Sequence, residues 1–193
     1  MFLKFANFAI RELTPMPTFL KIFLTLVASG FLSGVISAQP KAAGASFSMS
    51  GIGFSYEHAN DDERFMEISL KAELWEVFND RAEVPGVTVS FLWNLILKSW
   101  KSNEDNTLNI FAGTGISAGY TNDYRQAYGC VLGLKGKIGI ECCYMRRNIK
   151  LSASISPMIG THIRKENSTL RMDYYKSGIF NTIMPEIGIK YLF

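Results

Sequence analysis

Beyond residue 44, apolar residues alternate with small or polar residues at a period of two. This alternation is typical of β-strands, in which successive side chains point to opposite faces of a sheet. Turn-like stretches rich in Asn, Asp, Gly, Ser and charged residues separate the alternating segments. The pattern predicts eight strands, at 44–57, 65–75, 86–100, 107–121, 127–144, 148–164, 168–175 and 182–193. The alternation is least regular in 168–175.

The two faces of these strands differ in character. One face is largely Gly, Ser, Thr and Asn, as in 113–119 and 152–156, with only occasional charges. A face exposed to water usually carries many Lys and Glu, whereas small residues suit the narrow interior of an eight-stranded barrel. The other face is rich in Leu, Ile, Val and Phe, with Tyr or Trp toward strand ends, which suits lipid and the headgroup region.

These faces predict an all-β fold, a closed antiparallel up-and-down transmembrane β-barrel of eight strands. The alternative is a soluble lipocalin-like barrel, which also alternates but turns its apolar face inward. In lipid the sheet must close completely, because its edges find no other hydrogen-bond partners. Pro157 lacks a ladder donor, so we expect one local irregularity or bulge there.

An even number of strands places both termini at one end of a barrel. With the termini on the periplasmic side, the predicted strands make 58–63, 101–106, 146–148 and 176–181 the outward loops. All four are short. Short outward loops weaken a role in adhesion, which usually needs an exposed variable surface.

The first 38 residues have the layout of an exported leader. Residues 16–21 are a short basic segment, 22–36 are apolar, and the segment ends in Ser37-Ala38. This predicts a secretory signal peptide over 16–38, cleaved after Ala38, with 1–15 as an upstream extension. A transmembrane helix is the alternative, because the apolar run approaches spanning length. The domain boundaries are therefore 1–38 for the leader and 39–193 for the barrel.

The charge of the chain and the spacing of its cysteines argue against nucleic-acid binding and against a disulfide between Cys130 and Cys142. The leader contains three of the 20 basic and one of the 17 acidic residues, so the remainder carries 17 basic and 16 acidic residues, a net charge of +1. Without a basic cluster, this near-neutral chain gives no reason to expect nucleic-acid binding. Cys130 and Cys142 on one strand are too far apart for a disulfide, so we expect free thiols.

The last eight residues form a distinctive strand. Ile187, Ile189, Tyr191 and Phe193 fall on one face, and the aromatic Phe193 is the terminal residue. This segment resembles the closing strand of bacterial outer-membrane β-barrels, which their assembly machinery recognises. The resemblance is to the small OmpA/OmpX-like barrels and, as a motif, covers only 186–193. It implies that four residues form an assembly signal: Glu186, Gly188, Tyr191 and Phe193.

Charged residues on the inward faces predict a cluster in the lumen. Counting from the strand ends places Lys135 and Lys137 level with Glu67 and Glu186, and Lys71 lies on the same strand as Glu67. Buried charges must be paired to be tolerated. We therefore predict a polar cluster of Glu67, Lys71, Lys135, Lys137 and Glu186, either as a plugged lumen or as a narrow gated pore. Plugging is favoured because eight strands leave little room for water.

Two histidines provide the only candidates for catalysis. His58 lies close in sequence to Ser55, Asp61 and Asp62, and His162 shares a face with Ser156. Some eight-stranded outer-membrane barrels modify lipid A, so an outer-leaflet hydrolase or acyltransferase is the enzymatic alternative. A loop histidine beside acids is usually a solvated turn. We therefore expect no enzyme activity, no catalytic residue, no metal site and no cofactor.

The sequence as a whole favours an integral protein of the bacterial outer membrane with a non-catalytic structural or interaction role in the cell envelope. The resemblance implies a monomeric barrel inserted by the outer-membrane assembly machinery, with lipid and lipopolysaccharide as its surroundings. It does not imply a particular ligand. The soluble periplasmic ligand-binding barrel stays as a second alternative.

Overall fold

The computed structural model describes residues 41–79, 84–103, 106–123, 128–166, 169–178 and 184–193, all within one compact unit, Gln39–Phe193. The predicted leader lies outside the described residues. Two short helical elements have both ends within the described residues, α3 (Trp75–Phe78) and the 3₁₀ turn η1 (Met145–Arg147). The strands are β1 (Lys41–Ser48), β2 (Gly51–Ala59), β3 (Arg64–Glu73), β4 (Gly86–Asn103), β5 (Asn106–Asn122), β6 (Tyr128–Tyr144), β7 (Ile149–Ile155), β8 (Met158–Glu166), β9 (Thr169–Tyr174) and β10 (Glu186–Leu192).

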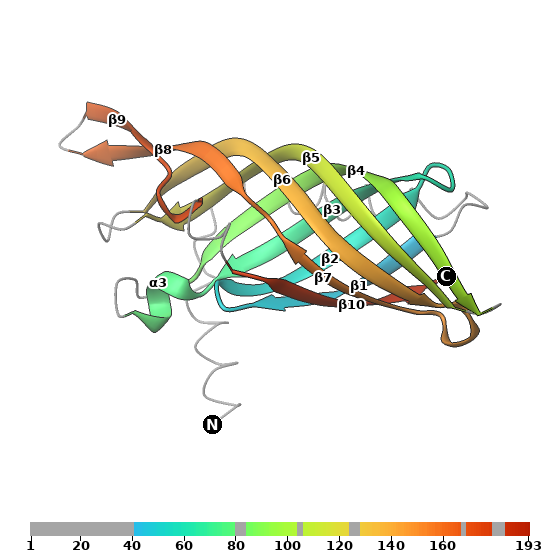
Figure 1. Ribbon diagram of the computed structural model, residues 1–193. Helices are drawn as coiled ribbons and strands as arrows, with labels where there is room; N and C mark the ends of the chain where they lie inside the picture. Colours follow the sequence, from blue (N-terminus) through green and yellow to red (C-terminus); the bar gives the residue numbers. More distant parts are fainter. Residues whose placement is uncertain (1–40, 80–83, 104–105, 124–127, 167–168, 179–183) are drawn as a thin grey trace, which may run out of the picture. The chain divides into compact units, whose positions relative to one another are not determined.

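The strands close into an antiparallel barrel (Figure 1). Each strand from β1 to β7 pairs with the next, β7 pairs with β10, and β10 pairs with β1, which gives a ring of eight. β8 continues the line of β7 along β6, and β9 pairs with β8. The predicted fold class, a closed eight-stranded antiparallel barrel, is confirmed.

The strands are staggered around this ring, so they tilt relative to the barrel axis. Starting at Ser46 and following the paired residues in one direction leads to Thr88 on β4. Following them in the other direction leads to Ser99 on the same strand, and the pairing has one irregularity between Ile96 and Lys98. The number of strands and their stagger together set the diameter of the barrel. Eight strands form a narrow barrel whose interior is filled by side chains.

The ring of strands differs from the prediction in two places. The predicted strand 44–57 is a hairpin, with β1 and β2 joined at Met49 and Ser50. Gly51 begins β2 at a φ of 156°, and a Cβ there would lie 2.0 Å from the carbonyl oxygen of Ala72. The predicted strands 168–175 and 182–193 do not each occupy a place in the ring, because β9 extends the sheet from β8 while β10 closes it against β7. The count of eight holds because these two differences offset each other.

The extra hairpin at the start reverses the predicted assignment of the loops. The turn 60–63, the ends of β4 and β5 at Asn103 and Asn106, and η1 lie at the same end as the C-terminus. Lys41 and Phe193 bond each other's backbones at this end, at 3.1 and 2.9 Å. The turn 49–50, α3, the start of β4, the end of β5, the start of β6 and the β8–β9 hairpin lie at the opposite end. If the termini are periplasmic, these are the outward connections. The prediction that 58–63, 101–106 and 146–148 face outward is therefore wrong.

Pro157 lies between β7 and β8, where the predicted strand 148–164 is interrupted. The register along β6 is the same on both sides of the interruption, with Ile138 opposite Ile155 and Lys135 opposite Met158. The amide of Gly136 donates to the carbonyl of Pro157 at 2.8 Å, but Pro157 has no N–H to return the bond. The predicted local irregularity is a break without a register shift.

The outer surface of the barrel is apolar and its interior is polar. Large apolar side chains on every strand of the ring are exposed, among them Ile52, Ile116, Leu134 and Ile187. Buried residues include many Ser, Thr, Glu and Lys, and buried apolar residues are comparatively few. A soluble barrel buries its apolar face, so this inverted arrangement excludes the lipocalin-like alternative. The chain is a membrane β-barrel of the outer-membrane type.

Among the described residues, no helix has both the length and the apolar character needed to cross a bilayer.

Candidate functional site: the charged lumen

The strand register places like charges side by side on two walls of the lumen. Glu57 on β2 lies opposite Glu67 on β3, and Lys150 on β7 lies opposite Lys190 on β10. Neighbouring like charges repel each other, so this arrangement is favourable only if each pair meets opposite charges from the other wall. The interior of the barrel provides this contact.

Lys137 and Lys190 join the two glutamates of β2 and β3. The ammonium nitrogen Nζ of Lys137 donates to both carboxylate oxygens of Glu67, at 2.7 and 2.9 Å. Lys190 donates to Glu57 and also reaches Glu67, with Nζ 3.3 Å from Oε2. The side chains of Lys190 and Glu67 are each 2% exposed, so these contacts lie out of water.

Lys150 extends the network toward the C-terminal end of the barrel. Its Nζ lies 2.9 Å from Oε2 of Glu57 and 3.1 Å from Oε2 of Glu141. Glu141 also accepts from the side-chain amide of Asn109 at 3.0 Å, and Lys150 lies 5.0 Å from the ring centroid of Phe65. We call the six charged residues Glu57, Glu67, Lys137, Glu141, Lys150 and Lys190 the ion-pair network. The network contains three positive and three negative charges, and each charged group contacts at least one group of the opposite charge.

The network separates two hollows in the barrel. The hollow at the C-terminal end has an empty volume of about 660 Å³, including space open to solvent, and Glu57, Glu141 and Lys150 form part of its lining. A smaller hollow lies on the other side and is lined in part by Lys135 and Glu186; its empty volume of about 360 Å³ also includes space open to solvent. Glu67, Lys137 and Lys190 line neither hollow, so they occupy the lumen between them.

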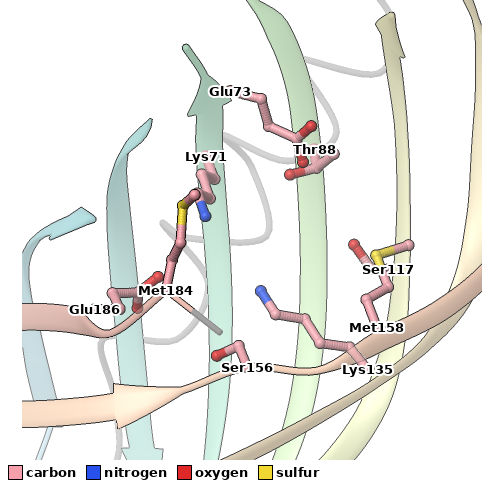
Figure 2. Close-up of a pocket in the computed structure, with 9 residues that line it drawn as sticks. All are labelled: Lys71, Glu73, Thr88, Ser117, Lys135, Ser156, Met158, Met184 and Glu186. Atoms are coloured by element: carbon pink, nitrogen blue, oxygen red, sulfur yellow. The ribbon is translucent and has the colours of Figure 1, made fainter. Parts of the chain in front are cut away.

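The predicted cluster is divided between the network and the smaller hollow. Glu67 and Lys137 belong to the network, and Glu186 lies 3.8 Å from Lys137. Lys71 and Lys135 instead point into the smaller hollow from different strands (Figure 2). Lys71 donates to the hydroxyl of Ser50 at 2.7 Å and Lys135 donates to that of Ser90 at 3.2 Å, so hydroxyl groups bind both ammonium groups.

The cluster predicted from the sequence did not include four residues of the network. Glu141, Lys150 and Lys190 lie on the inward faces of their strands, as the alternation requires, but the sequence did not show that they share one level in the barrel. Glu57 was missed because the single predicted strand 44–57 concealed the turn before β2. The available signal was a change of phase in the alternation, since Phe47 and Ile52 both point outward although one position is odd and the other even.

At the end opposite the C-terminus, a second group of polar contacts surrounds Tyr175, which follows β9 and is fully buried. The Tyr175 hydroxyl donates to Oε2 of Glu73 at 2.8 Å, and the Thr121 hydroxyl donates to the same oxygen at 3.1 Å. Burial and the adjacent carboxylate raise the pKa of the Tyr175 hydroxyl well above its usual value, so it remains a donor. Asp123 accepts from the backbone amide and hydroxyl of Ser177 at 3.0 and 2.9 Å.

The residues considered for catalysis do not come together. Ser55 is buried in the lumen, whereas His58 is on the alternate, outward-facing set of β2 with Ile52 and Phe54. Ser156 and His162 both face the interior but are six residues apart along an extended segment, and His162 Nε2 lies 3.1 Å from the carbonyl oxygen of Thr121. Neither pair provides a nucleophile in hydrogen-bond reach of a base.

The predicted assembly residues are divided between the two faces of β10. Tyr191 and Phe193 point outward with more than half of their surface exposed, together with Ile187 and Ile189. Glu186 and Gly188 belong to the opposite, inward set. An aromatic pair at the end of the outer face is typical of the membrane–water boundary.

Known proteins resemble this chain at the level of the fold. No family model and no curated protein matches it. Among solved structures, it is similar to a major outer membrane protein from Thermus thermophilus, with 10% identity and a TM-score of 0.45 over 81% of this chain and 100% of that one. It is also similar to Neisserial surface protein A (NspA), with 11% identity and a TM-score of 0.38 over 80% of this chain and 93% of that one.

Proposed function

We propose that this chain is an integral protein of the bacterial outer membrane whose lumen is closed by the ion-pair network, with a non-catalytic structural or interaction role in the cell envelope. The observation that carries the proposal is the position of Glu67, Lys137 and Lys190 between the two hollows. Their side chains are buried and joined to one another across the barrel.

The physical argument for closure is the cost of opening the network. An ion or water column would have to pass through the space that Glu67, Lys137 and Lys190 fill between the two hollows. Separating any pair leaves a buried charge without compensation, which costs several kcal/mol. In an eight-stranded barrel the walls leave little other space for a path. A closed lumen leaves the two ends and the lipid-facing surface as the regions for interaction.

The same reasoning supports the proposed partners. The exposed apolar belt suits outer-membrane lipid and lipopolysaccharide, and the outward Tyr191 and Phe193 on the closing strand suit recognition by the barrel assembly machinery. The separation of Ser55 from His58, on opposite faces of β2, supports a role without catalysis.

Conductance across planar bilayers tests the closed lumen. We expect the folded wild-type protein to show no stable channel. A variant with Glu67→Ser, Lys137→Ser and Lys190→Ser should conduct, because it removes both charge and volume from the segment between the hollows. A matched control, Lys71→Ser with Lys135→Ser, removes two lysines of the smaller hollow and leaves the network complete. A wild-type channel of stable conductance would contradict the proposal.

Membrane fractionation tests the location. The protein should be extracted only with detergent, from the outer-membrane fraction, and should migrate differently on a gel before and after boiling. An extracted band that does not shift would argue against a folded barrel in the membrane.

A further inference from the structure

β9 is the terminal strand of the sheet. It pairs with β8 along one edge, and no other described strand pairs with its second edge. The amide of Tyr175 donates to the carbonyl of Gly160 at 2.9 Å, which fixes the phase of the β8–β9 ladder. Because backbone groups alternate in direction along a strand, those of Arg171 and Asp173 point toward β8. The backbone groups of Leu170, Met172 and Tyr174 therefore point to the second edge.

This edge is exposed on both of its faces. All six residues of β9 are exposed, and Leu170 and Met172 are 75% and 70% exposed. The β8–β9 hairpin projects at the end of the barrel away from the C-terminus (Figure 1). An exposed, unpaired strand edge is a template for pairing with another strand, and native proteins usually block it with Pro, a bulge or a covering segment. The sequence Thr169–Tyr174 contains no proline, and its pairing with β8 has no bulge.

We infer that β9 is a docking edge for a second copy of this chain, which pairs antiparallel through β9 with Met172 opposite Met172. In this register Leu170 lies opposite Tyr174 of the second copy, and all three residues with edge-facing backbone groups form hydrogen-bonded pairs. Arg171 lies opposite Asp173 of the second copy, twice by symmetry. These are non-hydrogen-bonded positions, at which opposite side chains approach most closely.

The charge pattern selects this register over its neighbours. Shifting one copy by two residues in one direction places Arg171 opposite Arg171, and shifting it in the other places Asp173 opposite Asp173. Like charges directly opposite each other are destabilising. Both shifts also reduce the number of hydrogen-bonded pairs from three to two. The segment is therefore self-complementary in one register only.

The contacts already present in the hairpin are compatible with this pairing. Asp173 accepts from Arg164 at 3.1 Å through Oδ2, and its side chain is 49% exposed, so the carboxylate remains accessible to a second guanidinium. Arg171 makes contacts within its own chain. Its guanidinium has five N–H donors, so it can also bind a carboxylate of the second copy.

The symmetry determines how two barrels meet. A two-fold axis perpendicular to β9 reverses the direction of the strand, and the strands of a barrel run partly along the barrel axis. The two barrels therefore point in opposite directions. Two copies inserted in one membrane point in the same direction, so this dimer forms between copies in facing membranes, or freely in detergent. It departs from the monomeric barrel that the family resemblance implied.

Sedimentation in detergent tests the dimer without reference to the lumen or to cellular location. The wild-type protein should change from monomer to dimer as its concentration rises. Met172→Pro should remain monomeric, because it removes the central edge donor and leaves the β8 ladder intact. Met172→Ala is its control and should still dimerise. A wild-type monomer at every concentration, or a Met172→Pro dimer of wild-type affinity, would overturn the inference.

A charge variant tests the register. Arg171→Asp places two carboxylates opposite each other at each position and should weaken dimerisation by about tenfold or more. Within the hairpin it places Asp opposite Arg164, which does not threaten folding. Arg171→Lys should dimerise nearly as well as the wild type. Equal dimerisation by Arg171→Asp and the wild type would exclude this register.

Oxidative cross-linking tests the contact at its centre. The exposed Cys130 is first replaced by serine to remove a competing thiol. In that background Met172→Cys should form a disulfide-linked dimer, because opposite residues of a hydrogen-bonded pair lie about 5.5 Å apart. Thr169→Cys should not, because Thr169 lies far from its counterpart in this register. Equal cross-linking at the two positions would overturn the inference.

Lipid vesicles test the facing arrangement. Vesicles that contain the folded wild-type protein should cluster, as measured by light scattering, and vesicles with Met172→Pro should not. Equal scattering from the two preparations would overturn pairing between membranes. Neither result depends on conductance, so failure here and failure of the closed-lumen proposal are distinguishable.

Discussion

Lys137 of β6 and Glu67 of β3 meet across the lumen, with the lysine nitrogen 2.7 and 2.9 Å from the two carboxylate oxygens. The two residues are 70 positions apart in the sequence and come from strands that do not pair. This contact joins opposite walls of the barrel directly, in addition to the hydrogen bonds that join neighbouring strands. The ion-pair network is therefore a brace between the walls, and in our proposal it also closes the lumen.

Removing one partner of this contact should destabilise the barrel strongly. Lys137→Met leaves Glu67 with only the longer contact to Lys190, and a buried charge that loses its partner costs about 3–5 kcal/mol. The double variant Lys137→Met with Glu67→Met should lose less than the sum of the single variants, because neither charge remains unpaired. Urea unfolding in lipid vesicles measures each free energy. Additive effects would show that the two residues are not coupled.

The hydroxyl of Tyr175 should stabilise the end of the barrel opposite the C-terminus. Tyr175→Phe retains the buried ring but removes a donor to Glu73, and a hydrogen bond to a charged group contributes about 1.5–3 kcal/mol. We expect a loss of that size in the free energy of unfolding. Thr121→Val removes the longer bond to the same oxygen and should cost less. No measurable loss in Tyr175→Phe would show that the bond does not contribute.

Two of the three cysteines, Cys130 and Cys143, should differ in reactivity. Cys130 is exposed on the outer face of β6, whereas Cys143 is buried toward the lumen beside the network. An apolar, membrane-permeant maleimide should therefore label Cys130 in the folded protein and Cys143 only after denaturation. Mass spectrometry of labelled peptides measures both, and full labelling in denaturant is the control. Labelling of Cys143 at the rate of Cys130 would contradict the assignment of faces.

The faces of the strands were predictable because alternation is a local property. Ile187 and Ile189 point outward, and Gly188 and Lys190 point inward, as the period of two requires. The break at Pro157 was also predictable, because a missing N–H is a property of the residue itself. These features depend on the sequence of one strand and not on its neighbours.

Features that depend on pairing between strands were harder to predict. The turn at Met49 and Ser50 is encoded only by a change of phase in the alternation, and without this turn Glu57 could not be placed opposite Glu67. β9 and β10 follow each other in the sequence, but which of them closes the ring depends on pairing with β7 and β1. The contact of Glu67 with Lys137 was predictable because the extra hairpin moves both strands by one place in the ring and leaves their positions relative to each other unchanged.

The C-terminal Phe193 should contribute more to assembly in the cell than to the stability of the finished barrel. Its backbone exchanges two hydrogen bonds with Lys41, and its exposed ring points outward at the end of β10. Deleting it removes those two bonds, which contribute about 1–3 kcal/mol together, so the shortened protein should still fold in lipid vesicles.

In a bacterial host the same deletion should sharply lower the amount of folded, heat-modifiable protein in the outer-membrane fraction, if the assembly machinery reads the terminal aromatic residue. Phe193→Tyr keeps an aromatic terminus and should behave like the wild type. Refolding in vesicles separates the two effects, because it involves no assembly machinery. Equal amounts of the wild-type and shortened proteins in the outer membrane would remove Phe193 from the assembly signal. If the deletion lowers the yield of folded protein in vesicles as much as it does in the cell, its effect is on the stability of the barrel.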